Sequence, residues 1–167
     1  MDDEVWTDAA LVCMNGHVVN AASEMRPNFN SNYCPTCGER AISKCLNCQS
    51  QIPGQIHFLS DDMLGDGDKF MEPAPYCGGC GKPYPWTERR AQAFIELAHL
   101  TLNAQDAQEV EENLPDVMRD SPRTEVAVRK INGAFAKAGT WGLNTLKTAA
   151  PSLLTQSAML LLEHLLK

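Results

Sequence analysis

The first 80 residues hold every cysteine of the chain, arranged with one histidine as four pairs of potential metal ligands. A pair separated by two or three residues can place two ligand atoms on one turn of backbone, and two such turns facing each other form a tetrahedral zinc site. Seven cysteines cannot all pair as disulfides, whereas seven cysteines and one histidine make eight ligands. The pattern predicts two zinc ions per chain, held by Cys13, His17, Cys34, Cys37, Cys45, Cys48, Cys77 and Cys80.

Four pairs can combine in a sequential, an interleaved or a nested way, and we expect the sequential one. The ligands between residues 13 and 37 then form the first site, and those between residues 45 and 80 form the second. Each half runs in the same order, from a plain pair through a loop to a pair with a tyrosine before it and a glycine after it, which is an internal repeat. Closed four-ligand sites are structural, because a catalytic zinc needs an open position.

Short turns should position these ligands. The segment from Val12 to Val19 reads as strand, tight turn and strand, with Asn15-Gly16 in the turn. Gly38 stands where the chain must turn left-handed so that amides can point at sulfur, and Gln49 replaces glycine in the plainer third pair.

The other histidines and the aspartate-rich segment are not expected to bind metal. His57 lies between two apolar residues and should point outward from a strand, and His99 and His164 are outside the ligand pattern. The acidic run from Asp61 to Asp68 lacks the spacing of an EF-hand calcium loop, so we interpret it as a solvated hairpin tip.

Composition indicates a cytoplasmic protein. The chain opens on acidic residues rather than on a signal peptide, and no stretch reaches the roughly 18 apolar residues of a spanning helix. In a reducing compartment, Cys-x-x-Cys pairs bind metal rather than form disulfides.

The net charge of −7 is uneven along the chain. Residues 1–87 carry 11 acidic and five basic residues, and residues 88–167 carry 10 and nine. Seven thiolates and two zinc ions would bring the first part to about −9. Because binding a polyanion requires a basic surface, this balance disfavours nucleic-acid binding by the first part.

The second part of the sequence is helical in pattern. We expect a first helix from Thr87, acting as N-cap, to Leu102, and a second from Ala104 to Met118 with a new turn at Pro115. A third should start at Ser121-Pro122 and end at Gly139, and Pro151 should split the remainder. Tyr84 and Trp86, just before the first helix, are expected to pack the ribbon against it.

The sequence therefore predicts an α+β protein with two tandem zinc ribbons, built of short β-hairpins, followed by a small α-helical domain. The expected boundaries are 1–43 for the first ribbon, 44–86 for the second and 87–167 for the helical domain.

The last helix is apolar on more than one face between Met159 and Leu166. It could be the central helix of a small bundle, or it could bury a second face in another copy or another protein. Membrane binding is not expected, because the segment has almost no basic residues on its polar face.

Several of these motifs resemble a bacterial family. The runs from Cys13 to Asn20, from Tyr33 to Gly38 and from Tyr76 to Glu88, together with Ser121-Pro122-Arg123-Thr124, resemble the family catalogued as domain of unknown function 2321. The resemblance implies paired zinc ribbons, a helical tail and a cytoplasmic prokaryotic source. It implies no activity.

Three functions are compatible with these features. The one we favour is a non-enzymatic zinc-binding adaptor whose helical tail oligomerises or docks on a protein partner. The alternative is a nucleic-acid-binding ribbon protein, with phosphate contacts from the helical part through Arg89, Arg90, Arg119, Arg123, Arg129 and Lys130. An enzyme is not expected, because no nucleophile–base motif, phosphate loop or His-Glu zinc helix occurs.

Overall fold

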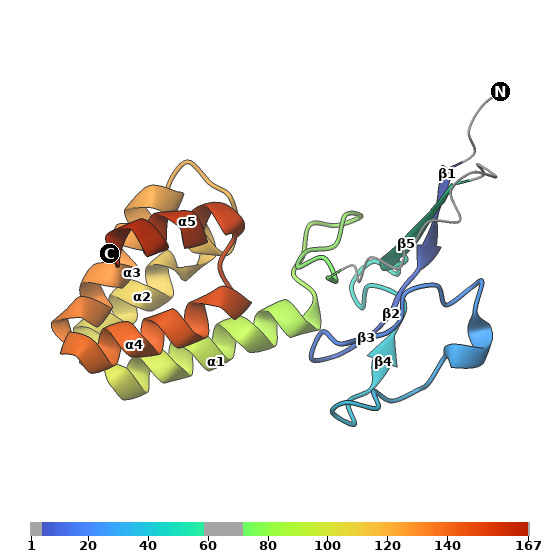
Figure 1. Cartoon of the computed structure of the whole chain (residues 1–167), viewed down its shortest axis with the longest axis horizontal. Coiled ribbons are helices and arrows are strands. Elements are labelled where there is room, and N and C mark those ends of the chain that lie inside the picture. Colours follow the sequence, from blue (N-terminus) through green and yellow to red (C-terminus); the bar gives the residue numbers. More distant parts are fainter. Residues whose placement is uncertain (1–4, 59–71, 167) are drawn as a thin grey trace. The chain divides into compact units, whose positions relative to one another are not determined.

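The computed structural model describes residues 5–58 and 72–166 and separates the chain into two compact units (Figure 1). Met1–Glu88 form the first, which we call the ribbon unit, and Arg89–Lys167 form the second, the helical unit. The predicted hairpin tip between Asp61 and Asp68 lies outside the described residues.

The ribbon unit contains two small antiparallel sheets. Strands β2 (Leu11–Cys13), β3 (Val18–Asn20) and β4 (Ala41–Ile42) form one, in the order β3-β2-β4. Strands β1 (Val5–Ala9) and β5 (Pro53–Phe58) form the other. This confirms the α+β prediction with short strands. The β1–β5 pairing joins the first predicted ribbon to the second, and the proposed boundary at residue 43 stays a prediction.

The core of the ribbon unit combines apolar side chains with metal ligands. Two cysteines of the last two pairs are buried in it beside aliphatic and aromatic residues. The members are Ala10, Val12, Ile42, Cys45, Ile52, Cys77, Tyr84 and Trp86. A core this small stabilises a fold weakly on its own, so a metal bound by its cysteines would add folding free energy directly.

Polar contacts fix the loop between β3 and the second ligand pair, which includes the 3-10 helix η1 (Pro27–Phe29). The buried carboxylate of Asp8 accepts hydrogen bonds from the amides of Glu24 and Met25, at 3.0 and 3.1 Å. The side chain of Asn20 donates to Asn30 Oδ1 at 2.7 Å. The loop is therefore held by hydrogen bonds rather than by burial of η1, which has no buried residue.

The helical unit packs around α3 (Thr124–Lys137), which contacts α2 (Ala104–Val117), α4 (Gly139–Ala149) and α5 (Gln156–Leu165). Helix α1 runs from Pro85 to Thr101, so its first four residues belong to the ribbon unit. The core of the helical unit contains Phe94, Val110, Leu114, Val117, Ile131, Phe135, Leu146 and Leu162, among others.

Helix α1 begins two residues before the predicted N-cap at Thr87, so that assignment is wrong. Pro85 occupies the first helical position, where a missing N–H costs nothing, and the carbonyl of Tyr84 accepts hydrogen bonds from the amides of Thr87 and Glu88. The hydroxyl of Thr87 instead donates to the carbonyl of Pro75 at 2.7 Å. Because the Thr87 hydroxyl bonds to the Pro75 carbonyl, it does not cap the helix, and α1 begins earlier than its local sequence predicts.

Two boundaries near prolines also differ from the prediction. Helix α2 begins at Ala104 as expected, after the N-cap Asn103. It continues through Pro115 without a new turn, because Leu114 and Val117 around it are buried in the core. Helix α3 begins at Thr124 rather than at Pro122, since the Ser121 hydroxyl accepts the Arg123 amide in a separate preceding turn. 

The end of α3 and the break at Pro151 are as predicted. Gly139 has φ 73° directly after α3, a left-handed conformation that favours glycine. The 3-10 helix η2 (Ala150–Ser152) contains Pro151 and separates α4 from α5, which starts after the Thr155 cap.

Helix α5 buries most of its apolar residues in the bundle. Ala158 and Leu162 are buried, and Met159, Leu161, Leu165 and Leu166 pack half-buried against the core. Leu160 is 61% exposed. Within residues 5–58 and 72–166, no helix is both long and apolar enough to cross a membrane.

Candidate metal centres

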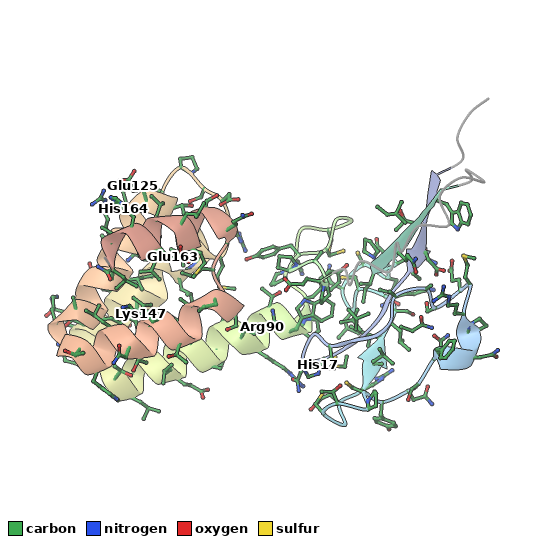
Figure 2. The ribbon with its side chains drawn as sticks, in the orientation of Figure 1. His17, Arg90, Glu125, Lys147, Glu163 and His164 are labelled. Atoms are coloured by element: carbon green, nitrogen blue, oxygen red, sulfur yellow. The ribbon has the colours of Figure 1, made fainter. Side chains whose placement is uncertain are left out.

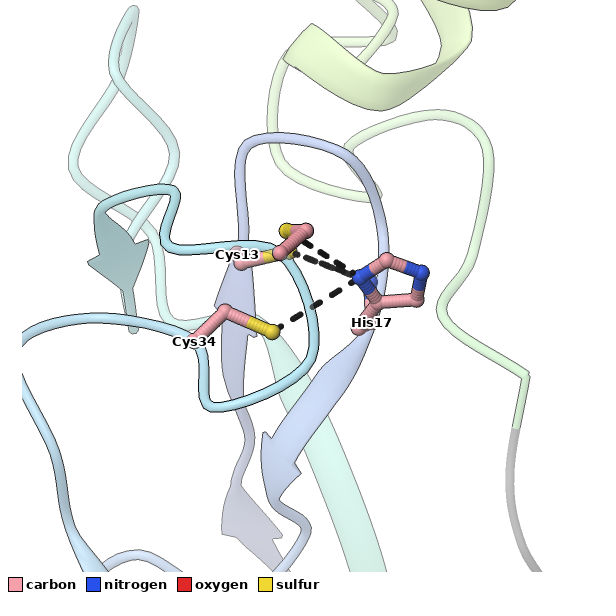
Figure 3. Close-up of side chains that lie close together, drawn as sticks. Cys13, His17 and Cys34 are labelled. Atoms are coloured by element: carbon pink, nitrogen blue, oxygen red, sulfur yellow. Dashed lines mark hydrogen bonds between the residues drawn. The ribbon is translucent and has the colours of Figure 1, made fainter.

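The first cluster brings together Cys13, His17, Cys34 and Cys37, with one ligand atom of each within 4.8 Å of the others. The Nδ1 atom of His17 lies 3.5 Å from Cys13 Sγ, 3.6 Å from Cys34 Sγ and 3.3 Å from Cys37 Sγ (Figure 3). Cys13 Sγ lies 3.7 Å from Cys37 Sγ. A tetrahedral zinc site has edges of about 3.8 Å between sulfurs and about 3.5 Å between sulfur and nitrogen. The atoms therefore stand at the corners of a coordination tetrahedron.

The β2–β3 hairpin supplies the first two ligands. Gly16 has φ 89° in the turn, as the Asn15-Gly16 pair predicts, and the amide of His17 donates to Cys13 Sγ at 3.3 Å. The side-chain amide of Asn15 donates to Cys37 Sγ at 3.5 Å. Asn15 therefore has a role beyond the turn, in orienting a ligand, which the sequence alone did not indicate.

The second cluster brings together Cys45, Cys48, Cys77 and Cys80. Cys45 Sγ lies 3.8 Å from Cys80 Sγ, and Cys48 Sγ lies 3.6 Å from Cys77 Sγ. Both distances match an edge of about 3.8 Å in a tetrahedron of sulfur ligands around zinc. The sequential grouping is confirmed, and the interleaved and nested groupings are wrong.

Equivalent left-handed corners close three of the ligand turns. Gly38 has φ 73°, Gly81 has φ 70°, and Gln49 has φ 63° at the corresponding place after Cys48. In each turn the corner residue donates its amide to the carbonyl of the first cysteine, as Gly81 does to Cys77 at 2.8 Å. The same turn directs amides between the first cysteine and the corner toward sulfur, as the Gly79 amide donates to Cys77 Sγ at 3.4 Å.

Backbone amides favour the thiolate form of two buried cysteines. Burial opposes ionisation of Cys34, but hydrogen bonds from the amides of Thr36 and Cys37 outweigh it and lower the pKa of Cys34 to about 6. Cys77 has the same balance, and the amides of Gly79 and Cys80 lower its pKa to about 6. Because the thiolate is the metal-binding form, both residues are prepared to bind at neutral pH.

Ser50 acts on the second cluster from outside the ligand set. The thiol of Cys48 donates to Ser50 Oγ at 3.2 Å. The same hydroxyl can donate to the thiolate form, and this bond is the main reason that the pKa of Cys48 is lowered. Sequence reasoning missed this contact, because a serine two residues after a cysteine is common in turns.

The remaining histidines lie apart from both clusters where the structure describes them. His99 Nε2 lies 3.5 Å from a carboxylate oxygen of Glu111. His164, on α5, lines a shallow pocket together with Glu125 of α3 (Figure 2). His57 is on strand β5 as predicted, opposite Trp6, and its side chain lies outside the described residues.

The fold is that of a protein with a helical bundle and two Cys/His clusters positioned for metal binding, which are consistent with zinc-ribbon-like sites. A family model matches residues 6–158, and the chain belongs to that family, described as an uncharacterized protein conserved in bacteria, or domain of unknown function 2321. No curated protein and no solved structure matches the chain.

Proposed function

We propose that the protein is a zinc-binding, non-enzymatic interaction protein whose two zinc ions are structural. The closed geometry of the clusters carries this proposal: each offers four protein donors at tetrahedral spacing, which leaves no position for a substrate or a reactive water. Sets of four thiolates, or of three thiolates and one imidazole, suit zinc among the common divalent metals. Bound in the ribbon core, the ions would hold together strands that bury little apolar surface.

An exposed, well-fixed loop supports the interaction role. The loop held by Asp8 and Asn20 displays Met25, Phe29 and Tyr33, which are 56%, 69% and 64% exposed. Methionine and aromatic residues are enriched at protein–protein interfaces. A loop that is already ordered loses less conformational entropy on binding. A polypeptide partner that covers these side chains would gain affinity from both effects.

The helical tail is a second candidate for partner or self-association. Since most apolar residues of α5 pack in the bundle, such an interface would centre on Leu160 and its polar neighbours Glu163 and His164, which are exposed (Figure 2). This surface is smaller than the sequence suggested.

The charge distribution favours a protein partner over a nucleic acid. Residues 1–87 carry 11 acidic and five basic residues, so this part of the chain would repel a polyanion. In the helical unit, three of the cations proposed for phosphate contacts are paired with carboxylates: Arg123 with Asp116 at 3.0 Å, Arg129 with Glu125 at 2.8 Å and Lys130 with Glu109 at 3.7 Å. Phosphate groups would have to compete with these carboxylates for the three cations, which supports a protein partner.

Metal analysis and partner capture test the two parts of the proposal. Native mass spectrometry should find two zinc ions per chain, and one ion or iron would contradict the assignment. Cross-linking in the bacterial host should then recover a protein with the wild type that the Phe29→Ser variant loses. The control Ala93→Ser, at an exposed position of α1 outside the loop, should retain it. A partner set that does not respond to Phe29→Ser or to Leu160→Glu would contradict the interaction surfaces.

A further inference from the structure

The first turn of α1 is bonded to the segment that leads into the last ligand pair. The amide of Tyr84 donates to the carbonyl of Pro75 at 3.0 Å, and the hydroxyl of Thr87 donates to the same carbonyl at 2.7 Å. The indole of Trp86 donates to the carbonyl of Ala74 at 3.1 Å. Residues 74 and 75 directly precede the turn that presents Cys77, so one short segment positions both the ligand and the helix start.

The same two aromatic residues fill the core around the second metal centre. Tyr84 and Trp86 are each 1% exposed, and their rings stack with centroids 4.6 Å apart and planes 19° apart. The described members of this core include Cys45 and Cys77 but neither Cys13 nor Cys34 of the first centre. Loss of metal at the second centre would therefore free Cys45 and Cys77 to move, and these are the cysteines in the core that contains Tyr84 and Trp86.

The hydroxyl of Tyr84 is buried and has no hydrogen-bond partner among the described residues. A buried hydroxyl without a partner costs roughly 1–3 kcal/mol, so an acceptor is expected nearby. Tyr84 packs in one buried cluster with Cys45 and Cys77, and the sulfurs of these cysteines are the side-chain acceptors among its buried members. Burial, followed by interaction with the Cys77 sulfur, also raises the pKa of Tyr84 above its ordinary value, in agreement with this packing. A metal-bound cysteine is a thiolate and is the stronger acceptor.

We propose that Tyr84 donates a hydrogen bond to the metal-bound sulfur of Cys77, and that metal at the second centre thereby fixes the first turn of α1. The conformation of the first turn of α1 then depends on metal at the second centre and does not depend on metal at the first. Tyr84 is a positioning residue, which acts on the metal through its ligand. The inference rests on the zinc assignment and goes beyond it, because two bound zinc ions alone would not make α1 respond.

Removing only the hydroxyl tests the first half of the inference. Tyr84→Phe keeps the stacked ring, and Tyr33→Phe is the control because Tyr33 is 64% exposed. In the full-length protein loaded with cobalt(II), the four-sulfur centre and the three-sulfur, one-nitrogen centre have distinct absorption bands. We expect Tyr84→Phe to weaken the four-sulfur centre about 10-fold in chelator competition and to leave the other unchanged. Unchanged or tighter binding at the four-sulfur centre would overturn the inference.

Amide hydrogen exchange tests the second half. Cys48→Ser and Cys37→Ser each replace one exposed ligand, in the second and the first centre respectively. We expect Cys48→Ser to speed exchange at the amides of Thr87 and Glu88, which bond to the Tyr84 carbonyl, and Cys37→Ser to leave them protected. The Leu102 amide donates to the Ala98 carbonyl at the C-terminal end of α1, and its exchange rate should not change in either variant.

Trp86 fluorescence gives an independent readout. With Trp6 and Trp141 replaced by Phe, the remaining buried indole should shift to longer wavelength when the second centre loses its metal. Equal responses to Cys37→Ser and Cys48→Ser would mean that metal acts on the whole ribbon unit, and that result would overturn the inference even if both zinc ions are confirmed.

Discussion

At the scale of single residues, backbone conformation decides how the ligand turns close. Gly38, Gly81 and Gln49 occupy equivalent left-handed corners, and such a corner costs a side-chain-bearing residue roughly 1–2 kcal/mol. Gln49 is the one residue other than glycine with positive φ in the described ranges, and its side chain donates to the Cys45 carbonyl at 3.3 Å. The hydrogen bond offsets part of the cost of its conformation.

Two glycines of the last ligand turn allow the cost of a left-handed conformation to be measured apart from steric collision of an added side chain. Neither Gly78 nor Gly81 has an atom within 4 Å of an added Cβ, but only Gly81 has positive φ. Gly81→Ala should therefore lower the free energy of unfolding of the ribbon unit by about 1 kcal/mol, whereas Gly78→Ala should leave it unchanged or slightly higher. Urea denaturation at fixed free zinc measures both. Equal effects would show that φ is not the cause.

The imidazole of His17 should matter for one centre alone. Its Nδ1 atom completes the first tetrahedron, and His17→Ala leaves three sulfurs there. We expect the first metal to be released at least 10-fold more readily and the second to be retained, by chelator competition. His99→Ala is the control, because His99 contacts Glu111 in the helical unit. If both metals are held as tightly as before, His17 is not a ligand.

At the scale of elements, side-chain contacts connect the ends of neighbouring helices. Asp106 lies in the first turn of α2, accepts a hydrogen bond from the Asn103 cap and pairs with Lys137 at the end of α3. The hydrogen bond with Lys137, ahead of that with Asn103, lowers the pKa of Asp106. The Asp106 carboxylate is buried and the Lys137 side chain is exposed. The ion pair therefore links a buried group at the start of α2 to an exposed group at the end of α3.

This pair should give the helical unit a pH dependence. Because the folded pKa of Asp106 is below its unfolded value near 3.9, the contribution is fully present above about pH 4 and is lost as pH falls through the folded value. Lys137→Met should destabilise α2 and α3 at pH 6, and the difference from wild type should shrink toward pH 2. Amide hydrogen exchange at Val110 in α2 and Ile131 in α3 measures this difference in stability. A difference that stays constant with pH would contradict the ion pair as its source.

Two helical glycines should respond to alanine in opposite directions. Gly133 of α3 has open space around an added Cβ, so Gly133→Ala should stabilise the helical unit by roughly 1 kcal/mol. At Gly142 of α4, an added Cβ would collide with the carbonyl oxygen of Phe135, so Gly142→Ala should force the two helices apart and destabilise the unit. Thermal unfolding followed at 222 nm compares them, and the same sign for both would contradict the packing between α3 and α4.

The sequence predicted most elements and the grouping of seven cysteines and His17 into two clusters, because both depend on spacing along the chain. The Ala104 start of α2, the Gly139 stop and the Pro151 break depend on residues a few positions apart and appear in the structure as expected. The start of α1 differs because a hydrogen bond to the carbonyl of Pro75, 12 residues earlier, outweighs the local cap signal at Thr87. The start of α3 differs because the Ser121 hydroxyl accepts the Arg123 amide in a separate turn before the helix. The choice of Nδ1 in His17 likewise depends on where the second ligand turn lies.

At the scale of the whole molecule, each unit has its own core and its own source of stability. The ribbon unit combines a small apolar core with two ligand sets, and the β1–β5 pairing that closes it joins strands more than 40 residues apart, for which the sequence holds no register signal. The helical unit has a larger apolar core without any cysteine. Chelation should therefore unfold the ribbon unit and leave the helical core intact.

Self-association through α5 would be a property of the whole molecule. Leu160 is 61% exposed whereas Leu162, two residues on, is 2% exposed in the core. Leu160→Glu should leave stability unchanged and abolish any self-association through this helix. Leu162→Ala should cost about 2–5 kcal/mol by opening a cavity, whether or not the protein associates. Light scattering of the full-length protein over a range of concentrations measures the association. A wild type that stays monomeric at high concentration would rule out self-association and leave α5 as a bundle helix, or as a docking site for a different protein.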